Sequence, residues 1–206
     1  MITIVNYGMG NLTSARMALE HVGADVDLTS DPERVAVAEA LVLPGVGAFP
    51  KAMRELRARG LEEPLRERHA AGVPIIGICL GMQLLFELSS EMGGETGLGF
   101  LGGTVEPLHT GPLKLPQIGW NEVAWRGDSP LSAGLPPRTA MYHVHSYAAR
   151  PADVTVVAGS AEYGEEFVSA VSRDNLFGVQ FHPEKSSADG LALLRNFVRL
   201  TAPVAA

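Results

Sequence analysis

The first 90 residues alternate short apolar runs with longer amphipathic stretches, and this pattern constrains the fold more than any other feature of the sequence. Apolar runs bounded by turn residues predict buried strands, and the stretches between them have helical periodicity. Strands and helices in this order form a mainly parallel sheet with helices on both faces. The expected strands are TIVN (3–6), DVDL (25–28), LVLP (41–44) and PIIGI (74–78).

The intervening stretches predict the helices. A helix over 12–22 can end at Gly23, and Asp31-Pro32 suits the start of a short one. We expect residues 51–71 to be helical with a break near Gly60 and Pro64. LGMQLLFEL (80–88) is expected to form the helix behind the fourth strand.

From Glu91 onward, Gly and Pro become frequent and alternating runs replace the helical ones. Such runs predict short strands, several of them paired antiparallel, before a closing helix over 188–200. No break in composition marks a second domain, so we expect one domain over 1–206. The expected strands are GGTVEPL (102–108), IGWNEVAW (118–125), TAMYHVHSYAA (139–149), VTVVAG (154–159), FVSAVSR (167–173) and NLFGVQF (175–181).

Composition excludes several classes of partner. The 206 residues are 46% hydrophobic and 19% charged, as expected for a globular protein, and the net charge of -7 argues against binding to nucleic acid or to an anionic membrane. No apolar run is long enough for a membrane span, and MITIVNYG lacks the features of a signal peptide. We therefore expect a cytoplasmic protein.

The single cysteine, Cys79, lies between two glycines in GICLGMQ (77–83), where the fourth strand turns into a helix. Such a turn exposes a nucleophile at the sheet edge, and the helix N-terminus favours the thiolate. Gly77 and Gly81 would allow the close passage of strand and helix, as in the G-x-S-x-G elbow. The N–H of Leu80 would supply half of an oxyanion hole. A small buried hydrophobe is the alternative role for this cysteine.

A nucleophilic cysteine needs a base, and His182 is the best candidate among six histidines. Residues two apart in an extended segment face the same side, so Glu184 can orient His182 across Pro183. The arrangement provides a base and its orienting group. His21, His69 and His109 lie in expected helices or in a Pro/Gly loop and are set aside.

Other motifs give weaker indications. His143 and His145 could form a metal-ligand pair, but further ligands at suitable spacing are missing, and a strand with one wet face is the simpler interpretation. NYGMGN (6–11) begins like a dinucleotide fingerprint, but Thr13 occupies its third glycine position. We expect neither a metal nor another cofactor. LPGVGAF (43–49) could add backbone N–H groups to the oxyanion hole.

Together, the G-x-C-x-G-x-Q elbow, the upstream P-G-x-G turn and the C-terminal H-P-E resemble the class I (triad) glutamine amidotransferases. Within that family, YGMGNL, PGVGAF, GICLGMQLLFE, LPQIGWN, VHSY and GVQFHPEKS are similar to the glutaminase subunits of imidazole glycerol phosphate synthase. The resemblance implies a three-layer α/β/α fold with a mainly parallel mixed sheet and antiparallel additions in the C-terminal half.

The resemblance also implies the reaction and the site. Cys79 would attack the side-chain amide of glutamine, His182 would transfer the protons, and Glu184 would orient His182. The family roles carried over to the remaining residues are an oxyanion hole at Val46, Gly47 and Leu80, and glutamine binding by Gly45, Gln83, Glu91, Ser146 and Tyr147.

A partner is implied as well, namely a TIM-barrel cyclase subunit that would form a heterodimer and receive the ammonia for histidine biosynthesis. A barrel of about 250 residues does not fit in this chain, so a separate chain would supply it. The interface candidates are Asn11, Gln117, Trp120 and Lys185. Three alternatives remain, namely a glutaminase for the anthranilate or pyridoxal phosphate pathway, a stand-alone cysteine hydrolase, and a non-catalytic subunit. His143, where the family pattern has an aromatic residue, has no implied role.

Overall fold

The computed structural model describes residues 1–201, so the last five residues of the expected domain (202–206) lie outside the described residues. Within 1–201, thirteen strands form one sheet in the order β2-β1-β3-β4-β13-β12-β10-β7-β5-β6, and β11, β8 and β9 join it through β12. None of the helices in this range has both the length and the apolar character needed to span a membrane.

The elements follow one another along the chain as helices and strands, then mostly as strands. The strands are β1 (Ile2–Val5), β2 (Val26–Thr29), β3 (Leu41–Gly45), β4 (Ile75–Cys79), β5 (Phe86–Ser89), β6 (Glu95–Thr96), β7 (Leu101–Pro107), β8 (Gln117–Trp125), β9 (Arg138–His145), β10 (Tyr147–Pro151), β11 (Val157–Glu162), β12 (Glu166–Arg173) and β13 (Leu176–Val179). The α-helices are α1 (Leu12–His21), α2 (Pro32–Ala36), α3 (Phe49–Ala58), α4 (Glu62–Ala70), α5 (Leu80–Leu84) and α6 (Ser187–Leu200), and the 3-10 helices are η1 (Glu91–Gly93), η2 (Pro130–Ser132), η3 (Val154–Val156) and η4 (Pro183–Lys185).

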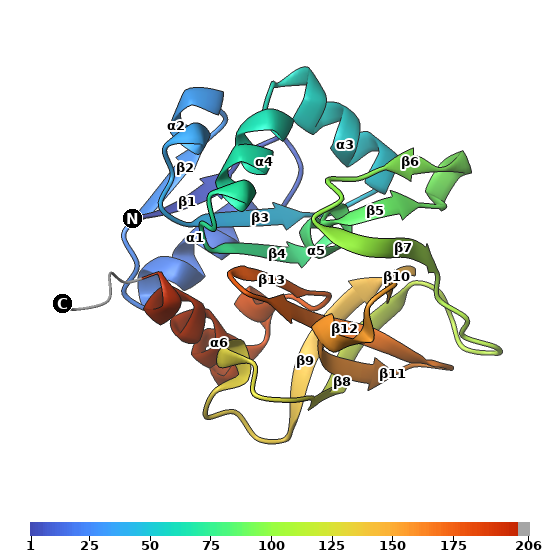
Figure 1. Cartoon of the computed structure of the whole chain (residues 1–206). Coiled ribbons are helices and arrows are strands. Elements are labelled where there is room, and N and C mark those ends of the chain that lie inside the picture. The colour runs from blue at the N-terminus through green and yellow to red at the C-terminus, as the bar shows by residue number, and fades with distance from the viewer. Residues whose placement is uncertain (202–206) are drawn as a thin grey trace.

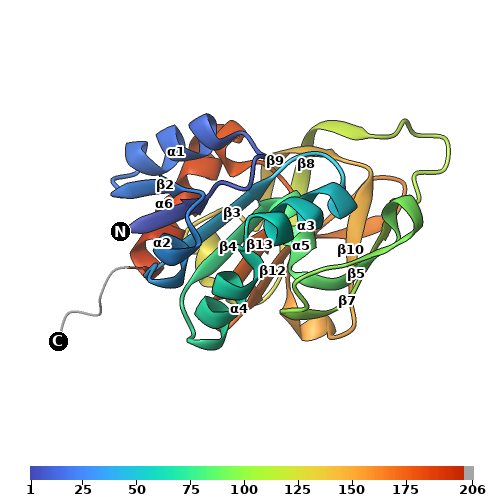
Figure 2. The ribbon, with the colours of Figure 1, turned by 90° about the horizontal axis from the view of Figure 1, so that it is seen from above.

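The strands β2, β1, β3, β4 and β13 form the parallel part of the sheet, from its β2 edge inward, with helices on both faces (Figures 1 and 2). Successive side chains of a strand point to opposite faces, so each strand contributes to two cores. Leu41 and Leu43 pack with α2, α3 and α4, whereas Val42 packs with α1 and α6. This gives the expected three layers.

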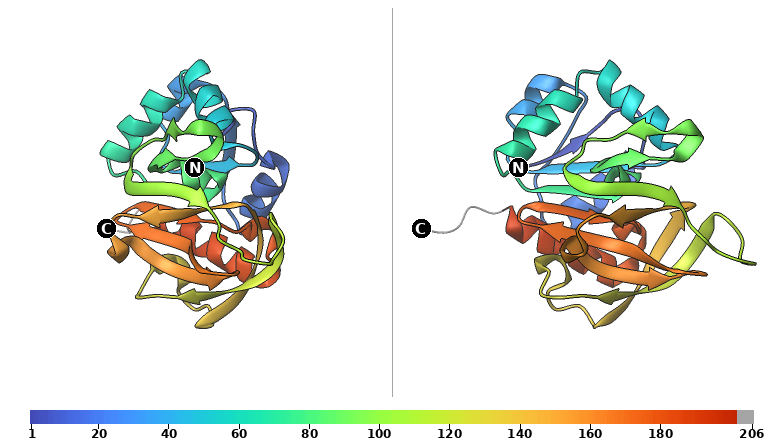
Figure 3. Two further views of the ribbon diagram at one scale, coloured as in Figure 1. Left: turned by 90° about the vertical axis from the view of Figure 1, so that its right-hand side faces the viewer. Right: turned by 45° about the vertical axis from the view of Figure 1, so that its right-hand side comes forward.

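The C-terminal half adds antiparallel strands. Strand β12 pairs antiparallel with β13, β11 and β10, and β8 pairs antiparallel with β9. These strands, coloured yellow to orange, lie with α6 in the lower half of both views in Figure 3. The expected fold, a mainly parallel centre with antiparallel additions in a three-layer α/β/α arrangement, is confirmed.

Four details of the expected elements were wrong. The strand expected over 154–159 begins only at Val157, because Val154–Val156 form the 3-10 helix η3. The helix expected over 80–88 ends at Leu84, because Phe86 is buried in a strand that pairs with β7 and β6. The strand expected over 139–149 divides at Ser146, because β9 pairs with β8 while β10 pairs with β7 and β12. Pro64 does not break a helix, because it lies in the first turn of α4, where a missing N–H costs little.

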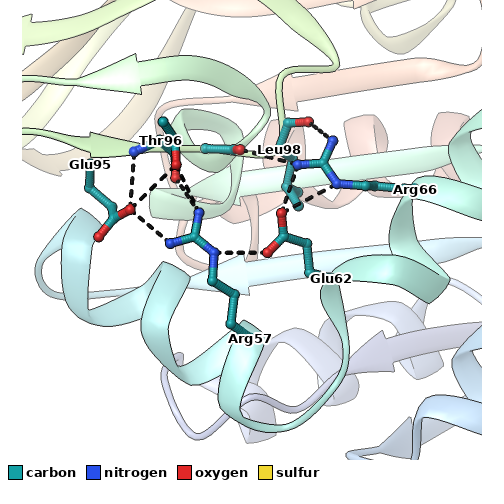
Figure 4. Close-up of polar contacts among 7 residues, drawn as sticks. Arg57, Glu62, Arg66, Glu95, Thr96 and Leu98 are labelled. Carbon is teal, nitrogen blue, oxygen red and sulfur yellow. Dashed lines mark hydrogen bonds and ion pairs between the residues drawn. The ribbon is translucent and has the colours of Figure 1, made fainter.

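An ion-pair cluster fastens α3 and α4 to the segment around β6 (Figure 4). The Arg57 guanidinium donates to Glu62 (2.9 Å), to Glu95 (2.7 Å) and to the carbonyl and hydroxyl oxygens of Thr96. Arg66 donates to Glu62 (2.7 Å) and to the carbonyl oxygen of Leu98 (2.5 Å). The segment that begins at η1 is therefore held against α3 through several side-chain contacts at once.

Candidate active site

Three neighbouring parallel strands end together at one edge of the sheet. Strand β4 lies between β3 and β13, with Cys79 opposite Gly45 and Ile78 opposite Val179. In open α/β sheets, sites form where the carboxyl ends of the strands meet. This register brings together the PGVG turn after β3, the cysteine that ends β4, and the H-P-E segment after β13.

Cys79 occupies the strained turn that the glycine spacing predicts. Its φ of 55° and ψ of -111° lie outside the regions that most L-residues adopt. A Cβ on Gly77 would come within 2.6 Å of the Gly81 backbone, and a Cβ on Gly81 would overlap the carbonyl oxygen of Leu43. Both glycines are therefore required by the close passage of β4, α5 and β3.

His182 and Glu184 form a buried hydrogen-bonded pair. Nδ1 of His182 donates to Oε1 of Glu184 at 2.8 Å, and the two side chains are only 5% and 3% exposed. The other carboxylate oxygen, Oε2, is buried without a hydrogen-bond partner within the described residues. A buried carboxylate with one partner interacts strongly with the imidazole that faces it, because little else compensates its charge.

His182 is protonated over the neutral range. Burial alone would lower its pKa, but hydrogen bonds and charge interactions with Cys79 and Glu184 outweigh burial and raise the pKa to about 10. A positively charged imidazolium beside the sulfur favours the thiolate form of a cysteine. The arrangement can therefore supply both a nucleophile and a proton donor.

The sulfur faces a pocket of about 330 Å³. The Cys79 sulfur also lies 3.7 Å from the carbonyl oxygen of Val144. Most of the residues that the sequence predicts for the site line this pocket, namely Val46, Gly47, Leu80, Gln83, Glu91, Ser146, Tyr147 and His182, and Lys185 joins them. Glu184 lies behind His182, and Gly45 lies at the end of β3, so neither lines the pocket directly.

The turn after β3 is a glycine-containing loop that lines the pocket beside the nucleophile. Val46 and Gly47 are exposed, and Gly47 has a φ of +97° that glycine adopts readily. Leu80 is the first residue of α5, so its N–H has no partner within the helix.

The hydroxyl of Tyr7 is buried next to Gly45, so close that a Cβ added to Gly45 would overlap it. This hydroxyl has no hydrogen-bond partner in the described range.

Gln83 is buried in the site, although helix periodicity alone would also have allowed a solvated position. Its Nε2 donates to the Tyr147 carbonyl (3.1 Å) and to Oε1 of Gln180 (3.0 Å). Oε2 of Glu91, which also lines the pocket, accepts from the backbone N–H of Phe49 at 2.7 Å, which fixes Glu91 at the N-terminus of α3.

The four interface candidates have different surroundings. Trp120 is 56% exposed, and Lys185 is exposed above the ring of Tyr142. Asn11 caps α1 by accepting from the N–H of Ser14. Gln117 departs from the expectation of a surface residue, because it is buried and its carboxamide contacts Nε2 of His145 at 2.8 Å.

The two histidines of β9 are buried structural residues. Nδ1 of His143 donates to the Met141 carbonyl, and Nε2 accepts from the Ser169 hydroxyl at 2.9 Å. Burial lowers the pKa of His143 to about 3, and it lowers the pKa of His145 to about 4. Both imidazoles are therefore neutral at physiological pH. No group of three or more metal-ligating side chains occurs among residues 1–201.

The sequence profile of the family described as glutamine amidotransferase class-I matches residues 3–200. The chain belongs to this family. A member of the class I glutamine amidotransferases is a glutamine-hydrolysing enzyme, and a cysteine beside a buried His–Glu pair suits that chemistry.

Relatives match along nearly the whole chain. The imidazole glycerol phosphate synthase subunit HisH of Rhodopirellula baltica is 50% identical, covering 99% of this chain and 98% of that protein. The subunit of the same name from Moorella thermoacetica is 49% identical, covering 97% and 94%. These amidotransferase relatives therefore share the length of the chain as well as its sequence.

Solved structures share the fold at lower identity. A crystal structure of a glutamine amidotransferase superimposes with a TM-score of 0.76 at 20% identity, covering 97% of this chain and 98% of that one. The structure of PurLQS from Thermotoga maritima gives a TM-score of 0.76 at 19% identity, with 97% of each chain covered. The amidotransferase fold of the chain is thus that of known structures.

Two residues near the nucleophile, Gln180 and Tyr7, were not predicted from the sequence. Gln180 is fully buried at the end of the apolar run LFGVQF, and a polar residue inside such a run is a signal that could have identified it. Tyr7 lies in the NYGMGN motif, but nothing in that motif indicates that its hydroxyl would lie beneath another turn.

Proposed function

We propose that the chain is the glutaminase subunit of imidazole glycerol phosphate synthase and supplies ammonia to a separate cyclase subunit in histidine biosynthesis. The observation that carries this proposal is the buried His182–Glu184 pair beside Cys79, at the base of a pocket lined by Gln83 and Glu91. The relatives of about 50% identity support the choice of synthase within the family. One sheet that continues through all the described strands supports a single domain.

In this proposal Cys79 attacks the carboxamide carbon of glutamine and forms a tetrahedral intermediate. The N–H groups of Leu80 and of the turn at Val46 and Gly47 stabilise the oxyanion, with Gly45 setting the path of that turn. His182 gives its proton to the leaving ammonia, and the thioester that remains is attacked by water, from which His182 takes a proton. Glutamate is then released, and the thiolate is restored.

Glutamine would be oriented by its amino acid head group. The Glu91 carboxylate suits the α-ammonium group, because it lies in the pocket and is held by the α3 N-terminus. The backbone of Ser146 and Tyr147 and the carboxamide of Gln83 supply further polar contacts from the other wall. This set of groups fits a small zwitterion better than a peptide.

The partner would dock on the face that surrounds the pocket. Ile118 (62% exposed) and Trp120 present apolar surface there, and Leu113 and Leu115 lie on the adjoining loop. Exposed apolar side chains that cluster beside a site are typical of an interface. Lys185 and Asn11 would add polar contacts, whereas Gln117 would act from below the surface. We place the complex in the cytoplasm, where histidine biosynthesis occurs.

Two alternatives remain. A glutaminase for the anthranilate or pyridoxal phosphate pathway would have the same triad and a different partner. A stand-alone hydrolase would need no partner at all. The test is to purify the chain with and without the candidate cyclase, and to measure glutamate release with and without the nucleotide ligand of the cyclase. Our proposal predicts low activity alone and a large increase in the liganded complex, whereas full activity of the isolated chain would contradict the coupling.

Variants of exposed residues test the docking face. We expect Trp120→Ala to weaken binding to the cyclase about tenfold or more, as is typical of a central interface aromatic. Val154→Ala is the matched control, because Val154 is 77% exposed but does not line the pocket or its rim. Equal binding by both variants would show that the partner docks elsewhere.

A further inference from the structure

The catalytic cysteine has a second buried polar neighbour besides His182. Nε2 of Gln180 lies 3.8 Å from the Cys79 sulfur, within the range of a hydrogen bond to sulfur. Gln180 is fully buried, and its backbone N–H donates to the Ser169 carbonyl at 2.9 Å. Its side chain is held as well, because its Oε1 accepts from Nε2 of Gln83 at 3.0 Å.

The surrounding hydrogen bonds determine which end of the Gln180 carboxamide faces the sulfur. The Tyr147 carbonyl can only accept, so Gln83 must present its NH₂ group to it. The same NH₂ group donates to Gln180, which must therefore present its oxygen to Gln83. The NH₂ group of Gln180 is left facing Cys79, so the sulfur meets a donor.

The position of Tyr147 is itself fixed from the other side. Its carbonyl accepts from Nδ1 of His145 at 2.9 Å as well as from Gln83. A carbonyl oxygen has two lone pairs, and both are used here. The contacts from Tyr147 through Gln83 to Gln180 therefore form one connected hydrogen-bond network.

We propose that Gln180 is a fourth functional residue at the nucleophile: it donates a hydrogen bond that stabilises the Cys79 thiolate and links the nucleophile to Gln83 in the glutamine pocket. This inference rests on the proposed role of Cys79. A donor to sulfur stabilises the charged form more than the neutral thiol, because hydrogen bonds to charged groups are the stronger ones. His182 supplies the positive charge on one side, and Gln180 supplies a neutral donor on another.

The pH dependence of Cys79 alkylation tests this role directly. The titratable groups around the sulfur are His182 with Glu184 behind it, the pocket residues His145, Glu91 and Lys185, and the buried hydroxyl of Tyr7. All of them are retained in Gln180→Met, which keeps the size of the side chain and removes its donor. A shift in the alkylation profile therefore reports on the Gln180 contact.

The experiment measures iodoacetamide alkylation of the full chain as a function of pH. We expect the midpoint to rise by about one pH unit in Gln180→Met, with alkylation about tenfold slower below the midpoint. Ser169→Ala is the control, because Ser169 is buried on the neighbouring strand and its hydroxyl bonds His143 and not Cys79. The control should keep the wild-type midpoint. Superimposable profiles for wild type and Gln180→Met would overturn the proposal.

A second measurement needs no altered protein. In the wild-type chain, the ¹⁵N–¹H signals of the Gln180 side-chain amide should move with the same midpoint as alkylation, and constant signals would contradict the hydrogen bond.

A third measurement uses the variant in the cyclase complex, where Gln180→Met should lose about tenfold in kcat. Because alkylation and amide signals do not depend on a partner, they decide the role of Gln180 even if the proposed synthase is incorrect.

Discussion

Nδ1 of His182 lies 2.8 Å from Oε1 of Glu184, across the single residue Pro183, and both side chains are almost completely buried. The short segment between them leaves the pair little freedom, because proline restricts its own backbone and that of the preceding residue. The fully extended segment expected from the sequence was wrong, because only His182 is extended while Pro183 and Glu184 lie in the 3-10 helix η4, which still brings the carboxylate to Nδ1.

Replacing Glu184 with Gln tests the charge of this pair. We expect Glu184→Gln to lower the pKa of His182 from its wild-type value of about 10, because a neutral amide no longer stabilises the imidazolium. Glutamine hydrolysis in the complex should fall about 100-fold. The pKa is measured by NMR titration of the His182 ring, and an unchanged pKa would contradict the assignment.

The same raised pKa predicts the pH dependence of stability. The folded-state pKa of His182 lies above the unfolded value of 6.5. The protonated imidazole therefore contributes its full stabilisation of the folded state below about pH 6.5, and this stabilisation is lost as the pH rises toward 10. Urea unfolding at several pH values should show this loss in the wild type, and the loss should be smaller in Glu184→Gln.

A Gly81→Ala substitution should disrupt the elbow. The added Cβ would overlap the Leu43 carbonyl, so α5 or β3 must move. We expect a loss of more than about 3 kcal/mol in the free energy of unfolding, or failure to fold. Gly102→Ala is the control, because its Cβ would make only ordinary contacts of 3.6 Å or more. Equal stability of the two variants would show that the elbow tolerates a side chain.

His143 should make the protein sensitive to acid. Its folded pKa of about 3 lies below the unfolded value of 6.5, so its contribution to stability is present above pH 6.5 and is lost as the pH falls toward 3. His143→Phe places an aromatic ring among Phe167 and Phe181, which already surround the position. We expect this variant to lose less stability than the wild type between pH 7 and pH 5 and to retain its glutaminase activity.

Arg57 should stabilise the attachment of β6 to α3. We expect Arg57→Met to cost about 1–2 kcal/mol of unfolding free energy, since the guanidinium makes several contacts at once rather than one exposed pair. Arg16→Met removes a single exposed i,i+4 pair and should cost less than about 0.5 kcal/mol. Equal losses in chemical denaturation would mean that the cluster in Figure 4 adds nothing as a network.

Much of the site could be predicted from the sequence because its determinants are local. The close passage of Gly77 and Gly81 and the spacing of His182 and Glu184 each involve only a few residues of the chain, and parallel strand order then brings them together. The strand at Phe86 could not be predicted in this way, since a short apolar run suits a helix or a strand until its pairing with β7 is known.

Contacts between distant segments set the remaining features. Gln117 is buried because His145, 28 residues further along, provides its hydrogen-bond partner. Gln180 meets the sulfur of Cys79 across a separation of 101 residues. The apolar run LFGVQF could have indicated that Gln180 is buried, but its contact with the sulfur, like the contact of Gln117 with His145, depends on segments far apart in the chain.

The most direct test of the account is the activity of Cys79→Ala in complex with the cyclase. We expect glutamate release from glutamine to fall by at least about 1000-fold, because the thioester cannot form. The same complex should still make product when ammonium salt replaces glutamine, which shows that the partner remains intact. Glutamate release at a rate near that of the wild type would contradict the assignment of Cys79 as the nucleophile.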